Sequence, residues 1–118
     1  VMISYGHIWS HEVGCDYYLT GRTPRQFLSL MYNANYIVTN SFHGIAFSLR
    51  FRKQFIPLKR GKYNNRIESI LRLVNLEDRL LMHENNIYNS EIDYERNVDQ
   101  IIGKMEEQSK QYLQRFMK

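Results

Sequence analysis

Residues 34–49 (Ala-Asn-Tyr-Ile-Val-Thr-Asn-Ser-Phe-His-Gly-Ile-Ala-Phe-Ser-Leu) constrain the fold of this chain more than any other stretch. Residues 36–39 are a run of β-branched and aromatic side chains, which predicts a short buried strand. Ser41 follows as a favourable helix N-cap. The apolar side chains after it repeat at helical spacing: Phe42, Ile45, Ala46 and Leu49. We therefore expect a strand, a tight turn and a helix to about Arg52, with His43 in the helix's first turn.

Strand-forming and helix-forming segments alternate before this stretch as well. Short strand-like runs occur at residues 1–4 and 15–19. Residues 23–26 (Thr-Pro-Arg-Gln) form a capping box with proline at the first helical position, so a helix is expected to begin there. The apolar face of that helix should contain Phe27, Leu30, Met31 and Ala34.

The same alternation continues after the central helix. Residues 54–58 (Gln-Phe-Ile-Pro-Leu) predict another buried strand, with Pro57 near its end. Asn65 is expected to cap the next helix, whose apolar face contains Ile67, Ile70, Leu71 and Val74. Alternating strands and helices predict a parallel sheet with right-handed crossovers. We therefore expect an α/β protein whose residues 1–118 form a single Rossmann-like domain, a parallel sheet flanked by helices.

A long helix is expected from about Asp93 to the end of the chain. Its apolar seam alternates steps of four and three residues: Val98, Ile102, Met105, Ser109, Tyr112 and Phe116. The seam holds too few heptads for a stable coiled coil, so we expect it to pack on this domain or on a neighbouring one. Pairing with a second copy of the same helix stays open.

The charges are distributed unevenly along the chain. The net charge is +4, and no acidic residue occurs between Asp16 and Glu68. The bases in this interval are Arg22, Arg25, Arg50, Arg52, Lys53, Lys59, Arg60, Lys62 and Arg66. A stretch of one sign attracts anions such as a phosphorylated small molecule, a nucleic acid or an anionic surface. The alternative is a basic face that is merely solvated.

The predicted fold indicates where these basic residues could bind an anion. In a parallel α/β sheet, the turns after the strands meet at the carboxyl-terminal edge, where ligands bind. Free amides and the helix dipole at a helix N-terminus favour an anion there. The residues that we expect to contact a ligand are Asn40, Ser41, Phe42, His43, Gly44, Lys59, Arg60 and Arg66. For His43 alone, a purely structural role as a capping residue is the competing interpretation.

Several other kinds of site are not indicated. His7 and His11 have a metal-like spacing, but nearby glycines argue against a helix and no third ligand is evident, so we expect no metal site. The single cysteine, Cys15, excludes an internal disulfide and is expected to be a packed side chain. No glycine-rich dinucleotide or phosphate loop occurs, so no cofactor is expected. No apolar run is long enough to span a membrane.

Residues 33–49, the proline-containing strand at 54–58 and residues 65–71 (Asn-Arg-Ile-Glu-Ser-Ile-Leu) together resemble the C-terminal half of the polysaccharide pyruvyl transferase family. The resemblance covers residues 24–78, with a looser match in the final helix. It implies two Rossmann-like domains that face each other, as in the GT-B glycosyltransferases. This chain would be the second domain of such an enzyme, and inactive without the first.

The resemblance also implies an activity. Enzymes of this family transfer pyruvate from phosphoenolpyruvate to two hydroxyls of a sugar, as a cyclic ketal. His43 coincides with the family's histidine, which is implicated with the donor. The family often carries an arginine two residues before that histidine, whereas Ser41 stands here. Arg66, Arg60 or Lys59 could supply the missing cation from the neighbouring loop.

The expected partners follow from this resemblance. They are phosphoenolpyruvate as donor substrate, a sugar or lipid-linked oligosaccharide acceptor for a cell-surface polysaccharide, and the N-terminal domain of the same enzyme. A cytoplasmic location is expected, with peripheral attachment to the inner face of the membrane as an option. Two alternatives remain open, a sugar-nucleotide glycosyltransferase half-domain of the GT-B type and a non-catalytic module that binds anions or nucleic acid. Because the aromatic residues fall at core spacings, nucleic acid is not expected as a partner.

Overall fold

The computed structural model describes residues 2–4, 18–20, 22–59, 64–80 and 91–117. Expectations for His7, His11, Cys15 and Arg60 therefore lie outside the described residues. The chain divides into two compact units, Val1–Asn33 and Ala34–Lys118, and each is described by itself.

The first unit contains two strands and a helix. Strands β1 (Met2–Ser4) and β2 (Tyr18–Thr20) pair in parallel. Helix α1 (Pro24–Asn33) begins at the predicted proline. The capping box is confirmed, because the Thr23 amide donates to Gln26 Oε1 at 3.0 Å and the Gln26 amide donates to Thr23 Oγ1 at 3.2 Å.

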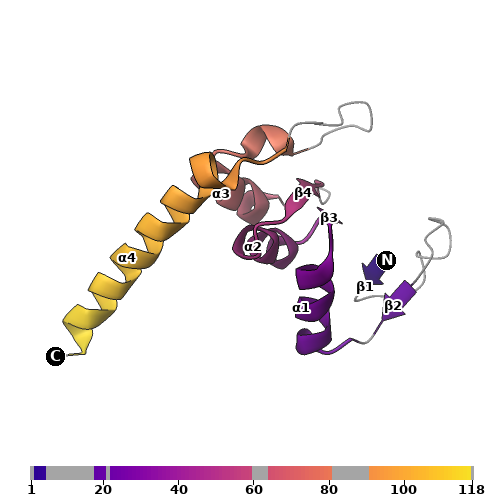
Figure 1. Cartoon of the computed structure of the whole chain (residues 1–118), viewed down its shortest axis with the longest axis horizontal. Coiled ribbons are helices and arrows are strands. Elements are labelled where there is room, and N and C mark those ends of the chain that lie inside the picture. The colour runs from indigo at the N-terminus through magenta and orange to yellow at the C-terminus, as the bar shows by residue number, and fades with distance from the viewer. Residues whose placement is uncertain (1, 5–17, 21, 60–63, 81–90, 118) are drawn as a thin grey trace. The chain divides into compact units, whose positions relative to one another are not determined.

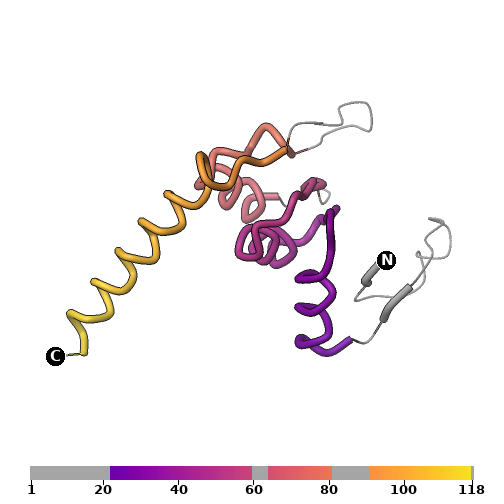
Figure 2. Tube along the Cα trace, in the orientation of Figure 1, coloured from indigo at the N-terminus to yellow at the C-terminus, as the bar shows by residue number. Residues whose placement is uncertain are grey.

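The second unit begins with a strand–helix–strand motif and continues with helices (Figure 1). The motif comprises β3 (Tyr36–Thr39), α2 (Phe42–Arg50) and β4 (Gln54–Pro57). Next come α3 (Asn65–Leu73), a 3₁₀ turn η2 (Glu77–Arg79), a π-helical turn η3 (Tyr94–Val98) and α4 (Asp99–Phe116). Figure 2 follows the chain from β3 through α2 into β4. β3 and β4 pair in parallel, with Tyr36 opposite Gln54 and Thr39 opposite Pro57.

The sheet differs from the expected one in extent and in burial. The described strands form two separate parallel pairs, β1–β2 and β3–β4, instead of one continuous sheet. One face of β3 is open, because Tyr36 is 50% exposed and Val38 is 60% exposed. The expectation that this strand is buried is therefore wrong within the second unit, where its residues are exposed or half-buried. The Tyr36–Thr39 composition indicates a strand but cannot show how many layers cover it.

The core of the second unit lies between α2, β4 and α3. Ile45 and Leu49 from the predicted face of α2 are buried, whereas Phe42 packs against the core at its edge. The remaining buried apolar side chains are Phe55, Ile67, Leu71, Val74, Leu76, Ile92, Tyr94 and Val98. The core therefore packs the strand–helix–strand motif against residues much later in the chain, Ile92, Tyr94 and Val98.

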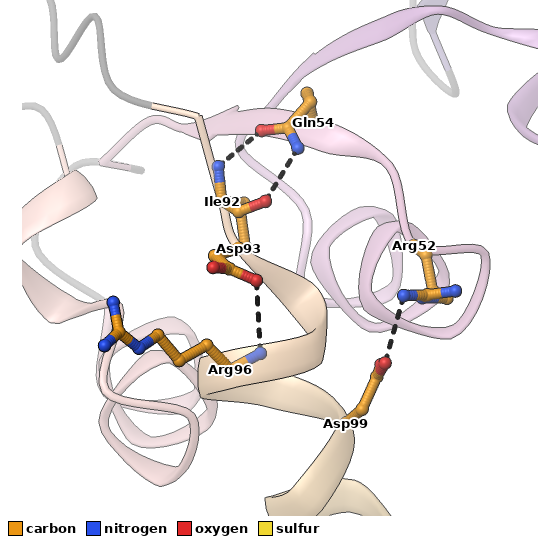
Figure 3. A network of polar contacts seen from close by, with 6 residues as sticks. All are labelled: Arg52, Gln54, Ile92, Asp93, Arg96 and Asp99. Atoms are coloured by element: carbon orange, nitrogen blue, oxygen red, sulfur yellow. Dashed lines mark hydrogen bonds and ion pairs between the residues drawn. The ribbon is translucent and has the colours of Figure 1, made fainter.

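Residues 91–99 are anchored beside the amino-terminal end of β4 (Figure 3). The Gln54 side chain accepts from the Ile92 amide at 2.7 Å and donates to the Ile92 carbonyl at 2.9 Å. Both polar groups of one residue are thus satisfied by a single side chain, as they would be by a neighbouring strand. The Tyr94 hydroxyl is positioned to donate to the backbone carbonyls of Ser48 and Lys53.

Helices α2 and α3 both end in Schellman motifs without a glycine. In α2, the Lys53 amide donates to the Ser48 carbonyl and the Arg52 amide to the Leu49 carbonyl. In α3, the same pattern places Asn75 after the helix. Arg52 and Asn75 consequently adopt positive φ values of 54° and 57°. This motif ends α2 at Arg50, two residues earlier than expected.

The start of α3 also differs slightly from the prediction. Asn64 occupies the N-cap position and its side chain makes no capping hydrogen bond, while Asn65 is the first helical residue. Asn64 is buried, with 8% of its surface exposed, whereas Asn65 is exposed. The sequence does not distinguish the two adjacent asparagines as N-cap candidates. In the structure, the buried one, Asn64, occupies the N-cap position.

Within the described part of the chain, helix α4 contacts the rest of the second unit through its first half. Ile101 and Ile102 pack against the core directly after the buried Val98. Two exposed ion pairs add to this, Arg52–Asp99 at 3.0 Å and Arg50–Glu106 at 2.8 Å. The predicted packing of the seam on this domain is thus confined to its first residues. None of the helices that the structure describes is long and apolar enough to span a bilayer.

Asn75 offers a test of the Schellman motif that closes α3. A left-handed conformation costs a non-glycine L-residue about 1 kcal/mol, and asparagine tolerates it better than alanine. We expect Asn75→Gly to raise the free energy of unfolding by up to about 1 kcal/mol and Asn75→Ala to lower it by about 1 kcal/mol. Urea unfolding of the two variants measures this difference, and equal stabilities would contradict it.

Tyr94 predicts how stability responds to alkaline pH. Burial raises the pKa of its hydroxyl far above the usual value, against the opposing charges of Arg79 and Arg52. Above about pH 10 the unfolded state loses this proton and the folded state keeps it, so stability falls as the pH rises. We expect this fall to be steeper than in Tyr94→Phe by up to about 1.4 kcal/mol per pH unit. Urea unfolding from about pH 9 to 11 measures both slopes, and equal slopes would refute the assignment.

Candidate active site

The carboxyl-terminal ends of β3 and β4 lie side by side. Thr39 pairs with Pro57, and the Leu58 amide donates to the Thr39 carbonyl at 2.8 Å. Each strand leads to a helix whose second residue carries a basic side chain, His43 in α2 and Arg66 in α3. The sequence places both residues in first helical turns, and the structure confirms those positions.

The turn into α2 is fixed by two side-chain hydroxyls. Thr39 Oγ1 accepts from the Ser41 amide at 3.1 Å, and Ser41 Oγ accepts from the Gly44 amide at 3.4 Å. Ser41 is therefore the N-cap, as predicted. Among the backbone amides of residues 41–44, those of Ser41 and Gly44 thus have internal partners. The amides of Phe42 and His43 have no such partner among the described residues, and they can bind an anion at the positive end of the helix.

Gly44 allows the start of α2 to lie directly against β3. A Cβ atom at this position would stand 2.2 Å from Thr39 Oγ1 and 3.0 Å from Thr39 Cβ. No side chain larger than hydrogen fits without moving the strand or the helix. The Ser48 hydroxyl strengthens the same contact region by donating to the Gly44 carbonyl at 2.6 Å. The position of His43 relative to β3 therefore depends on a glycine beside it.

The Phe42 ring brings the two helix starts together. The Arg66 guanidinium lies over this ring, with its Cζ 4.5 Å from the ring centre. The His43 ring meets the same phenyl ring at 84°, with 5.6 Å between centroids. Phe42 is half-buried, whereas His43 and Arg66 are exposed. Two basic side chains from different helices are thus held on one aromatic ring, with their polar groups accessible to solvent.

The charges that surround the sheet differ between its two ends. Near the amino-terminal end of β4, Arg50 and Arg52 are neutralised by carboxylates of α4. At the carboxyl-terminal end, Lys59 and Arg66 make no ion pair within the described part of the chain. Lys59 is half-buried directly after the ladder ends, and Asn40 is exposed at the same edge. The positive potential therefore remains where His43 lies.

A shallow hollow occurs at the opposite end of β4. It is lined by Arg52 and by residues 91–95, which include three carboxylates: Glu91, Asp93 and Glu95. It contains none of the predicted site residues. Its acidic lining does not suit an anionic ligand, so we place the candidate site at the carboxyl-terminal edge, around His43.

Two structural roles at this site were not expected from the sequence. Thr39 was assigned only to the strand, although its hydroxyl orients the Ser41 amide. The second role belongs to the Phe42 ring, which contacts both the Arg66 guanidinium and the His43 ring. A threonine that ends a strand two residues before a capping serine is a signal that could have indicated the first role.

A parallel strand–helix–strand motif with basic side chains around a helix N-terminus defines an α/β protein with a basic sheet edge. Comparison with known proteins makes the assignment narrower. The family model described as polysaccharide pyruvyl transferase matches residues 4–63, about half of the chain. The chain belongs to the polysaccharide pyruvyl transferase family. No curated protein and no solved structure matches it.

The family match confirms the resemblance noted in the sequence and shifts its limits. It begins at residue 4, within a region where the sequence alone showed no likeness. It includes the whole β3–α2–β4 motif with His43 and Lys59, and it ends before Arg66. The family match thus covers the candidate site except for Arg66.

Gly44 and Gly103 provide a matched test of the close helix–strand contact. We expect Gly44→Ala to lower the free energy of unfolding by about 1–3 kcal/mol, the usual cost of overpacking. In Gly103→Ala a Cβ meets nothing within 4 Å, so the better helix propensity of alanine should raise stability by up to about 1 kcal/mol. Thermal or urea unfolding compares them. If both substitutions stabilise the protein, the contact with Thr39 does not constrain the turn.

Proposed function

We propose that this chain is the donor-binding domain of a polysaccharide pyruvyl transferase that uses phosphoenolpyruvate. The observation that carries the proposal is the convergence of Arg66 and His43 on the Phe42 ring, next to two open helix amides. Phosphoenolpyruvate has a phosphate and a carboxylate on one small carbon frame. A site for it needs several cationic or N–H donors close together, and this edge supplies them.

The reaction requires an acid and a means of stabilising anionic groups. A proton is added to the methylene carbon of phosphoenolpyruvate, which becomes a methyl group and leaves a cationic carbon beside the carboxylate. A sugar hydroxyl attacks this carbon and loses its proton. The carbon–oxygen bond to phosphate then breaks, and a second hydroxyl closes the cyclic ketal while inorganic phosphate carries away the remaining proton. Donor and diol thus yield ketal and phosphate without an oxidant or a cofactor.

The residues of the edge divide these tasks between them. In the proposal, the Phe42 and His43 amides hold the phosphate at the positive end of α2. Arg66 binds the carboxylate or phosphate in a bidentate manner, and so supplies the cation that the family arginine would have supplied at Ser41. His43 acts as the general acid or as a charged phosphate ligand. Lys59 adds a further positive charge from the end of β4, and Arg60 follows it in the sequence.

The proposal includes the rest of the enzyme. We propose that the chain is the C-terminal, Rossmann-like half of a GT-B-like protein, and that an N-terminal domain carries most of the acceptor site. The acceptor would be a sugar or a lipid-linked oligosaccharide of a cell-surface polysaccharide, handled in the cytoplasm. Neither a metal nor a nucleic acid takes part. A sugar-nucleotide glycosyltransferase half-domain is the second candidate, and the following experiment separates the two.

An amide NMR titration with phosphoenolpyruvate tests the donor site. We expect saturable shifts at residues 41–44 and 64–66, and no comparable shifts with UDP. Arg66→Ala should weaken binding about tenfold or more, because a hydrogen bond to a charged group contributes about 1.5–3 kcal/mol. His43→Ala should weaken it similarly. Arg72→Ala, which removes an exposed arginine from the far end of the same helix, is the matched control and should leave binding unchanged.

Three outcomes would count against the proposal. Shifts with UDP and none with phosphoenolpyruvate would favour the glycosyltransferase interpretation. An equal loss of binding in Arg66→Ala and Arg72→Ala would indicate general attraction to a basic chain. If the full-length enzyme forms its ketal at an undiminished rate with His43→Ala, His43 has no catalytic role.

A further inference from the structure

The part of α4 from Met105 onward exposes a row of large apolar side chains. Met105 is 42% exposed, Tyr112 61%, Leu113 57% and Phe116 72%. We call these four residues the apolar arc. No residue of α4 is buried, and the Tyr112 and Phe116 rings contact each other, with 4.9 Å between their centroids. Met117, which follows the helix directly, is 84% exposed.

The arc has the geometry of one face of an amphipathic helix. With about 100° of rotation per residue, its four members fall within about 100° of one another. Lys110 and Arg115 each lie about 60° beyond one border of the arc by the same rotation. Long basic side chains at the two borders of an apolar face can extend to a polar phase while the apolar face is buried.

The charged side chains at the end of the helix are all basic. After Glu107 the chain has no acidic residue, and its bases are Lys110, Arg115 and Lys118. Two acids of the first half, Asp99 and Glu106, are already paired with Arg52 and Arg50. The third acid of this half, Glu107, accepts from Gln111 Nε2 at 3.3 Å and lies about 120° from the arc by the same rotation, on another side of the helix. A surface that complements the end of the helix must be apolar in its interior and anionic at its rim.

We propose that residues 105–117 dock on an anionic lipid surface, with the apolar arc in the interfacial region and Lys110 and Arg115 at the headgroups. A second copy of the chain fits this face less well. Parallel pairing would bring the bases of both helices together, and antiparallel pairing would need Glu106, which Arg50 holds. The arc is also too short for a stable coiled coil. This inference goes beyond the proposed function and stands without it.

Vesicle sedimentation of the whole chain tests the proposal. We expect binding to vesicles of phosphatidylcholine with phosphatidylglycerol, and little binding to phosphatidylcholine alone. The double variant Lys110→Gln/Arg115→Gln should lose about 10- to 30-fold in affinity, because each base near such a surface contributes about 1 kcal/mol. Leu113→Ser/Phe116→Ser removes apolar area and no charge, and should lose at least as much. Both pairs lie outside the core, so far-UV circular dichroism should show a folded protein.

The matched control separates docking from the general attraction of a basic protein. Arg72→Gln/Arg96→Gln removes the same charge from exposed positions on α3 and η3, outside α4, and should change binding less than twofold. An equal loss in this control would overturn the proposal. So would unchanged binding of Leu113→Ser/Phe116→Ser, which would show electrostatic adsorption only. Dimers in sedimentation equilibrium that this variant abolishes, with no vesicle binding, would assign the arc to a second copy.

Discussion

The close contact between Gly44 and Thr39 is the constraint on which the candidate site depends. Since Gly44 has no side chain, the start of α2 lies directly on the end of β3. The Thr39 hydroxyl can then accept from the Ser41 amide, and Ser41 can cap the helix. One small residue thereby fixes where the open amides of α2 point, and the neighbouring histidine takes its position from the same contact.

The two ends of the β3–β4 pair carry out different tasks. At the amino-terminal end of β4, the interactions are internal: Gln54 binds the Ile92 backbone, Tyr94 binds two carbonyls, and acids of α4 pair with Arg50 and Arg52. The polar groups in these contacts are paired within the protein. At the carboxyl-terminal end, basic groups remain accessible around His43. The residues that hold residues 91–99 in place therefore differ from the basic residues at the candidate site, although the Gly44–Thr39 contact at that edge also contributes to the fold.

Much of the local structure could be predicted from the sequence, because it follows from short-range chemistry. The capping box before α1, the strand at Tyr36–Thr39 and the Ser41 cap depend on neighbouring residues alone. The open face of β3 and the split into two strand pairs could not be predicted, since they depend on which layers cover a strand. The contact of Arg66 with Phe42 joins residues of different helices, and no local pattern encodes it.

Ser41 shows how a departure from a family pattern can be accommodated. The position needs a short side chain that accepts a hydrogen bond, because it caps α2 and contacts the Gly44 amide. An arginine there would supply a cation but could not accept that bond. Here Ser41 provides the cap, and Arg66 brings a guanidinium to the same edge from α3. The Phe42 ring makes this possible, because its π face attracts a guanidinium without neutralising the charge that an anion would meet.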